Sequence, residues 1–159
     1  MSNQVMTKMV LGSWHSTIKR ADALFEGISD EEMKNEIVPN RNRGVYLLGH
    51  LAAVHDMMLP LLNLGESQFP ELLSSFIRTP DDAGNDKFTV KELREFWKSA
   101  NAELAKQMDK LSPEEWLEKH NSISEEDFAN DPHRNRLSVV ISRTNHVSYH
   151  LGQFVLLKK

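Results

Sequence analysis

The sequence predicts an all-α protein, a four-helix bundle with short extra helices in the connections. Four long segments carry apolar residues at steps of three and four, the spacing that places them on one face of an α-helix. No segment sustains the period-two alternation of a half-buried strand, and no internal repeat is present. Because amphipathic helices bury their apolar faces against one another, four of them are expected to pack as a bundle.

Length and composition are those of an ordinary globular domain. The 159 residues fit a single domain, residues 1–159, with enough chain to bury one core. Hydrophobic residues make up 40% and charged residues 26%, which is typical of a folded chain. A net charge of −4 without a basic block argues against nucleic acid or an anionic membrane as a partner. No apolar run approaches the roughly 20 residues that a membrane-spanning helix needs.

The chain contains no cysteine. This excludes disulfides, a thiolate nucleophile of the protein itself and cysteine-ligated zinc, so histidine, aspartate and glutamate must supply any metal ligands. The N-terminus also lacks the charged, apolar and small-residue order of a signal peptide. We therefore expect a cytoplasmic protein.

The first long helix is expected over residues 4–27, with Gly27 at its end. Its apolar stripe consists of Met6, Val10, Trp14, Ile18, Ala21 and Phe25. Ser29-Asp-Glu-Glu32 follows with the spacing of a capping box, in which the serine and the glutamate each satisfy a backbone N–H of the other. It predicts one short turn of helix.

The second long helix is expected from about residue 43 to residue 64. Pro60 lacks a backbone N–H and should kink the helix or end it early. Gly65 is a candidate C-cap, because glycine readily adopts the left-handed conformation that ends many helices. A short helix is possible over residues 69–77, and the polar, turn-rich segment after it predicts a loop or crossover.

Two further capping boxes mark the second half of the chain. Thr89-Val-Lys-Glu92 opens the third long helix, and Ser112-Pro-Glu-Glu115 predicts a short helix with proline at its first position. Residues 121–134 are polar and are expected to be irregular. The last long helix is expected over residues 135–157.

Three histidines on two of these helices suggest a metal site. His146 and His150 are four residues apart, about 40° around the helix, so both can bind one divalent ion. His50 lies in the apolar stripe of the second helix between Leu47 and Val54. A lone buried histidine is more often a core residue bonded to a carbonyl or a tyrosine, but three that lean inward favour a site with a fourth position open to water.

The other histidines are weaker candidates. His55 is five residues from His50, about 140° around the helix, and is interpreted as a boundary residue. His15 is interpreted as a solvated edge residue, although it could approach a cleft. His120 and His133 lie near predicted loops and are expected to be exposed.

Three polar residues of the last helix could assist the site. Arg143 falls between the histidines and the apolar stripe, where a guanidinium needs an anion or carbonyl oxygens. It could bind a carboxylate or phosphate of a substrate, although pairing with an acidic residue inside the bundle is slightly favoured. Gln153 could orient His150 or cap the edge of the bundle. Tyr149 could act as an acid or as a hydrogen-bond partner, but its default interpretation is that of a packing residue.

Leu48-Gly49-His50-Leu51 together with His146-x-x-x-His150-Leu-Gly-Gln153 resembles the DinB-like (DinB/YfiT) superfamily of metal-dependent enzymes. The order of elements and loops agrees along nearly the whole chain. The resemblance implies an up-down-down-up bundle, often a homodimer, with a divalent ion, commonly zinc or nickel, on His50, His146 and His150. The resemblance also extends to Arg143, because relatives carry an arginine one turn before the first histidine of the last helix. Characterised members include bacillithiol-dependent S-transferases and a mycothiol-dependent maleylpyruvate isomerase.

One functional hypothesis follows: a metal-dependent transferase or hydrolase that activates a low-molecular-weight thiol or water for attack on a small electrophile. Any thiol must be diffusible, because the chain has no cysteine. Arg143 would hold an anionic group of the thiol or substrate. Tyr149, His55 and His15 are candidates for the general base by elimination only.

The alternative hypothesis is a non-catalytic metal-binding or stress-response module acting through a dimer surface. Its ion would stabilise the bundle, with the fourth position closed by Asp22, Asp56 or His15. In a third interpretation no metal is bound, and the histidines are hydrogen-bonded core residues.

Overall fold

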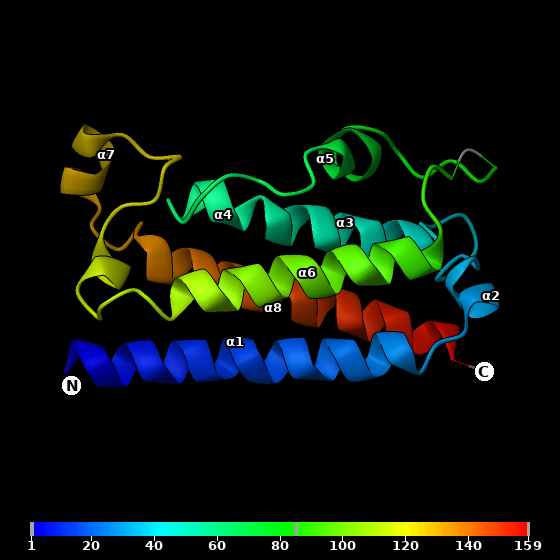
Figure 1. Cartoon of the computed structure of the whole chain (residues 1–159), viewed down its shortest axis with the longest axis horizontal. Helices are drawn as coiled ribbons and strands as arrows, with labels where there is room; N and C mark the ends of the chain where they lie inside the picture. The colour runs from blue at the N-terminus through cyan, green and yellow to red at the C-terminus, as the bar shows by residue number, and fades with distance from the viewer. Residues whose placement is uncertain (1, 85, 159) are drawn as a thin grey trace.

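The computed structural model describes residues 2–84 and 86–158, and within these ranges it is helical without a strand. The bundle consists of four long helices, α1 (Asn3–Glu26), α3 (Gly44–Asp56), α6 (Val90–Met108) and α8 (Arg136–Phe154). α1 and α8 run toward one end of the molecule and α3 and α6 toward the other (Figure 1). The most extensive contacts join α1 to α8 and α3 to α6. The predicted up-down-down-up bundle is therefore confirmed.

Short helices occupy the connections, and two of them, α2 (Asp30–Met33) and the 3₁₀ turn η1 (Glu115–Leu117), begin at predicted capping boxes. The Ser29–Glu32 and Thr89–Glu92 boxes are formed reciprocally, as are the Ser112–Glu115 hydrogen bonds. The other short elements are α4 (Met58–Leu61), α5 (Glu71–Phe76), α7 (Glu125–Asn130) and the 3₁₀ turn η2 (Val155–Leu157). Helix α7 was not expected, because residues 121–134 were interpreted as irregular. The Ser124 side chain caps it at the N–H of Asp127.

The expected helix over residues 43–64 is interrupted at Met57, between α3 and α4. Pro60 explains the position of the break. A proline within a helix lacks the N–H that would bond to the carbonyl four residues earlier, and its ring collides with that carbonyl. Here that carbonyl belongs to Asp56, the last residue of α3. The predicted effect of Pro60 is confirmed.

The end of α4 differs from the expectation that Gly65 caps it. Asn63 adopts the left-handed conformation, with φ of 58°. The N–H of Leu64 bonds to the carbonyl of Leu59 at 2.8 Å, and the N–H of Asn63 bonds to that of Pro60 at 3.2 Å. These two bonds make a Schellman motif, in which asparagine is tolerated at the left-handed position.

The apolar core fills the bundle along its length in two clusters. One contains Phe25, Leu51, Trp97 and Phe154, and the other contains Trp14, Met58, Leu104, Trp116 and Val140. The stripes predicted for the long helices supply most of these side chains. No helix in the described part of the chain is long and apolar enough to cross a membrane.

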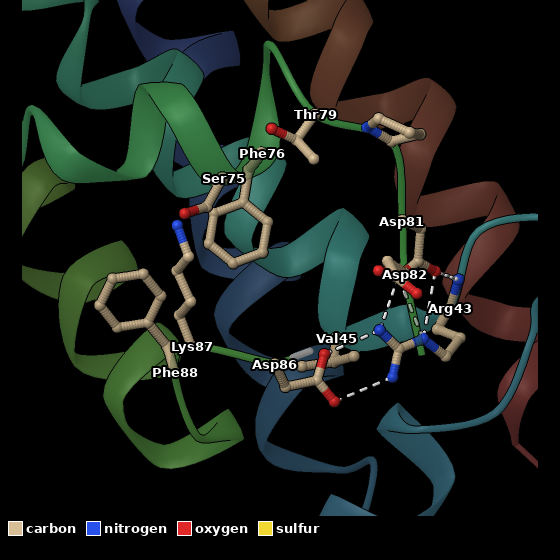
Figure 2. Close-up of a pocket in the computed structure, with 11 residues that line it drawn as sticks. Arg43, Val45, Ser75, Phe76, Thr79, Asp81, Asp82, Asp86, Lys87 and Phe88 are labelled. Atoms are coloured by element: carbon tan, nitrogen blue, oxygen red, sulfur yellow. Dashed lines mark hydrogen bonds and ion pairs between the residues drawn. The ribbon is translucent and has the colours of Figure 1, made fainter. Parts of the chain in front are cut away.

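An ion-pair cluster fastens the crossover between α5 and α6 to the start of α3 (Figure 2). The Arg43 guanidinium lies 2.6 Å from Asp81 and 2.7 Å from Asp86, and the Arg43 backbone N–H donates to Asp81 at 2.7 Å. Hydrogen bonds to Asp86 and Asp81 raise the pKa of Arg43 above its usual value. The adjacent cavity, about 120 Å³ beside Phe76 and Phe88, has no histidine among the described residues that line it.

Candidate metal centre

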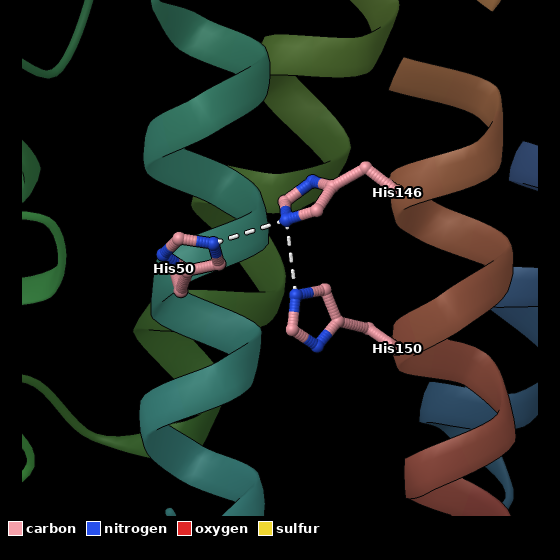
Figure 3. A group of neighbouring side chains, drawn as sticks. All are labelled: His50, His146 and His150. Atoms are coloured by element: carbon pink, nitrogen blue, oxygen red, sulfur yellow. Dashed lines mark hydrogen bonds between the residues drawn. The ribbon is translucent and has the colours of Figure 1, made fainter. Parts of the chain in front are cut away.

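Three imidazoles converge between α3 and α8 (Figure 3). Nε2 of His146 lies 3.2 Å from Nε2 of His50 and 3.0 Å from Nε2 of His150. The candidate ligand atoms of all three residues lie within 4.8 Å of one another. A tetrahedral ion with bonds of about 2.05 Å separates its nitrogen ligands by about 3.3 Å. The donor set therefore fits a divalent ion.

Hydrogen bonds at the far side of two rings prepare Nε2 for metal binding. Nδ1 of His50 lies 3.0 Å from the carbonyl oxygen of Phe76, at the end of α5. Nδ1 of His150 lies 2.6 Å from Oε1 of Gln153, one turn further along α8. Because both partners are acceptors, each Nδ1 carries the proton and each Nε2 keeps its lone pair free. Gln153 therefore orients His150.

His146 is held in its neutral form. Burial is the main cause that lowers its pKa to about 4, and the charges of His150, His50 and Arg143 lower it further. Burial also lowers the pKa of His150. A neutral imidazole is the form that binds metals, so at neutral pH no proton has to be removed from His146. Its buried Nδ1 has no hydrogen-bond partner among the described residues.

Arg143 lies three residues before His146 on α8 and is half-buried. The ion pair with an acidic residue that the sequence favoured is not formed with any residue that the structure describes, and the buried Nε has no acceptor there. Burial lowers the pKa of the guanidinium from its usual value. Arginine nevertheless stays charged in proteins, so a cation without a carboxylate partner lies near the histidines.

Tyr149 is 66% exposed, so the default interpretation as a packing residue is wrong. The centroid of its ring lies 5.1 Å from that of His150. Tyr149, His150 and Gln153 together line one side of a cleft of about 530 Å³. The cleft gives small molecules a place to lie beside a candidate ligand of the metal.

His55 is fully buried and is not the boundary residue that its helical position suggested. Its ring lies between those of Trp14 and Trp97, with centroids 4.9 and 4.6 Å away. Nδ1 lies 2.8 Å from Oδ1 of Asn101. Burial lowers the pKa of His55 to about 3. It therefore joins the two core clusters and is shielded from any substrate.

The remaining histidines lie away from the triad. His15 and His133 are exposed, as expected, whereas His120 is partly buried and contacts the hydroxyl of Ser122 at 2.9 Å. His15 is thus a solvated edge residue.

The side chains proposed to close a fourth metal position have other partners. Asp22 accepts a hydrogen bond from Nε1 of Trp97 at 2.7 Å. Asp56 accepts from the backbone N–H groups of Gln68 and Phe69 at 2.8 and 3.0 Å. Among the described residues, the group at the triad contains the three histidines and no carboxylate.

The order of helices and the triad agree with the expectations from the sequence. A search of curated proteins finds no match to this chain. The family model of the DinB superfamily, in contrast, matches residues 13–154. This range includes α3, α6 and α8 entire and all three histidines. The chain therefore belongs to the DinB superfamily.

Proposed function

We propose that this protein is a divalent-metal-dependent transferase or hydrolase. The observation that carries the proposal is the convergence of three Nε2 atoms from α3 and α8, without a fourth protein ligand among the described residues. Three protein ligands and one open position are typical of catalytic rather than structural zinc sites. A divalent ion held there lowers the pKa of a thiol or water in the open position, so that it can attack a small electrophile.

The protein's own groups prepare this chemistry. The Phe76 carbonyl and Gln153 hold His50 and His150 with Nε2 toward the centre, which removes the cost of orienting them on binding. Three neutral imidazoles leave the full charge of the ion uncompensated, which favours an anionic nucleophile. Zinc and nickel both suit an imidazole set, so either can be the resident metal. Arg143 supplies a further positive charge next to His146, inside the bundle, that can stabilise an anion at the metal centre itself.

Tyr149 is the proposed hydrogen-bond partner of the reacting molecules, because its exposed ring stands at the cleft beside His150. We do not assign the general base to His55 or His15. The former is sealed in the core with a pKa lowered to about 3, and the latter is an exposed residue of α1 outside the cleft lining. Metal analysis of a Tyr149→Phe protein should therefore be normal while its turnover falls.

The non-catalytic alternative requires a protein side chain in the fourth position. Asp22 and Asp56 are engaged elsewhere and His15 is exposed, so each of the three suggested candidates lacks support. This favours a catalytic ion over a purely structural one.

We also propose that the protein is a homodimer. Light scattering on the purified protein measures its oligomeric state directly.

The proposal is tested in two steps. The purified protein is first analysed for bound metal beside the variants His50→Ala, His146→Ala and the matched control His15→Ala. We expect about one ion per chain in the parent and the control and loss of the ion in the two triad variants. Equal metal content in all four proteins would contradict a triad site.

The metal-loaded protein is then incubated with an electrophilic bimane probe and a panel of small thiols, and with an activated ester in the absence of thiol. Metal-dependent conjugation indicates a transferase, and metal-dependent ester cleavage indicates a hydrolase. Absence of both, in a protein that binds its ion through the triad, would overturn the enzymatic proposal and favour the structural role.

A further inference from the structure

The cleft beside His150 contains a recognition feature that the histidine triad does not explain. We propose that Arg41 binds a carboxylate of the molecule whose other end occupies the metal centre, so that the cleft selects small organic anions. The proposal rests on the proposed function, since it assumes that a small molecule reaches the triad. It assigns substrate selection to a residue of the connection between α2 and α3 rather than to Arg143.

The cleft lies between this connection and the C-terminal end of α8. Its lining is partly polar and partly apolar, which suits an amphiphilic molecule. Arg41, Asn42, Tyr149 and Gln153 provide polar groups, while Ile37 and Leu47 provide apolar surface. Its volume of about 530 Å³ is within the range of about 300–1,000 Å³ found for small-molecule sites. A ligand can therefore bury an apolar segment and still present a polar end to the rim.

Arg41 is the only charged side chain among the described residues that line the cleft, apart from the titratable His150. No acidic residue is part of the lining, and Arg41 forms no ion pair with any residue in the described ranges. A guanidinium presents a planar fork of N–H donors that matches the two oxygens of a carboxylate. The charge of the cleft therefore favours an anion of that shape.

The turn that carries Arg41 is held by several bonds, so the backbone of Arg41 has a defined position at the rim of the cleft. Asn40 adopts the left-handed conformation with φ of 64°, and its N–H donates to the Glu36 carboxylate at 2.9 Å. The N–H of Arg41 bonds to the carbonyl of Val38 at 3.1 Å. Two residues further on, Arg43 is clamped by its two aspartates (Figure 2). A preordered turn loses less entropy when it binds a ligand.

Arg143 is poorly placed for the same task. It is absent from the lining of the cleft and precedes His146, whereas the cleft opens at His150, on the C-terminal side of the triad. The two arginines therefore have different roles. Arg143 affects the charge at the centre from inside the bundle, and Arg41 selects the molecule that enters.

The test uses cobalt(II)-loaded protein, in which a bound thiolate produces a charge-transfer absorption band. Two carboxylate thiols, 3-mercaptopropionate and 6-mercaptohexanoate, are titrated beside the neutral thiols 2-mercaptoethanol and 6-mercaptohexanol. For each protein the ratio of dissociation constants, neutral over anionic, is calculated at equal chain length. Comparison of this ratio between variants cancels the intrinsic difference in basicity between the thiols.

The proteins compared are the parent, Arg41→Ala, Arg41→Glu and the matched control Arg134→Ala. Arg134 is an exposed arginine just before the N-terminal end of α8, whereas the cleft lies at the C-terminal end of that helix. We expect the ratio for at least one chain length to fall by about threefold to tenfold in Arg41→Ala, as for a partly exposed ion pair, and further in Arg41→Glu. It should be unchanged in Arg134→Ala, and thermal unfolding should show that all four proteins are folded.

The outcomes separate this inference from the proposed function. If no thiol produces the band in the parent protein, thiol activation fails, and the ratio is measured instead with acetohydroxamate and succinic monohydroxamate, which bind the ion through oxygen. Selectivity that depends on Arg41 with either pair supports the carboxylate site. If ligands bind the ion but the ratio is the same in the parent and in both Arg41 variants, Arg41 does not recognise the carboxylate and the inference is overturned.

Discussion

Residue by residue, the environment decides what a histidine does in this protein. His50 and His150 each have an acceptor at Nδ1, whereas His55 has Asn101 at Nδ1 and two tryptophan rings in contact with its own. The first two are thereby oriented to bind an ion, and the third is a neutral part of the core. The same side chain thus serves two purposes, because hydrogen-bond partners and burial select its tautomer and its charge.

Replacement of Gln153 by leucine should weaken metal binding without removing a ligand. Nδ1 of His150 would lose its acceptor at 2.6 Å, so the ring would no longer be held with Nε2 toward the centre. Loss of such supporting bonds typically lowers metal affinity by about 10-fold to 100-fold. A competition titration with a chromophoric chelator measures the change. Gln4→Leu, on the exposed side of α1, is the control, and equal affinity in both variants would show that Gln153 does not support the site.

Asn101→Leu should destabilise the fold through His55. The substitution leaves the buried Nδ1–H of His55 without its acceptor. An unsatisfied buried donor costs about 1–3 kcal/mol of unfolding free energy. Urea denaturation measures this, with Ser99→Leu at an exposed position of the same helix as the control, for which a change within about 0.5 kcal/mol is expected. A loss no larger than the control's would mean that the Asn101–His55 bond contributes little.

At the scale of elements, the short helix α5 orients His50, a candidate metal ligand on the long helix α3. Helix α5 ends at Phe76, whose carbonyl accepts from His50 of α3. Gly49, next to His50, allows this contact because a Cβ there would lie 2.5 Å from the Phe76 ring. The distance between α3 and α5 therefore affects both packing and the orientation of a metal ligand.

Gly49→Ala should cost stability and metal affinity together. The added methyl group forces the ring of Phe76 to move, and overpacking of this kind typically costs about 1–3 kcal/mol. The control is Gly12→Ala in α1, where a Cβ meets no atom within 4 Å. That control should gain about 0.5–1 kcal/mol, because alanine is the better helix former. Denaturant unfolding and metal titration of both variants measure the effects. If the two variants had the same stability and the same metal affinity, α5 would have moved away from α3 without cost.

At the scale of the whole molecule, the fully buried His55 and the half-buried His146 link stability to pH. The structure lowers the pKa of His55 to about 3 and that of His146 to about 4, both below the roughly 6.5 of an unfolded chain. As the pH falls below about 6.5, these two histidines become protonated in the unfolded chain but stay neutral in the folded chain. Acidification therefore favours unfolding, whereas the contribution of these groups is fully present above that pH.

For the metal-free protein, we expect the free energy of unfolding to decrease as the pH is lowered from 7 to 5. The fully buried His55 contributes a slope approaching about 1.4 kcal/mol per pH unit once the pH is well below 6.5, and the half-buried His146 contributes less because solvent screens part of its shift. Urea titrations at several pH values measure the slope. Removal of one group with His146→Gln should reduce it, and His133→Gln at an exposed position should leave it unchanged. A flat profile in the parent protein would contradict the buried neutral state.

The sequence by itself determined the local structure and the identity of the candidate ligands. Helical periodicity, three capping boxes and Pro60 act within a few residues, so they predicted the long helices, their starts and the break. His50, His146 and His150 were recognisable because an i, i+4 pair and a stripe position have directions that follow from helix geometry. The Ser124–Asp127 cap of α7 was readable in the same way, but the polar composition around it concealed it.

Only the tertiary structure decided which groups from distant parts of the chain meet. Its contributions are the Phe76 carbonyl at His50, Asn101 at His55, the lack of an acidic partner for Arg143 among the described residues, and the presence of Arg41 in the cleft that His150 also lines. Each depends on how two elements pack across the bundle. Periodicity specifies the direction of a side chain around its own helix, but the helix or loop that it faces there is set by the packing of the whole core.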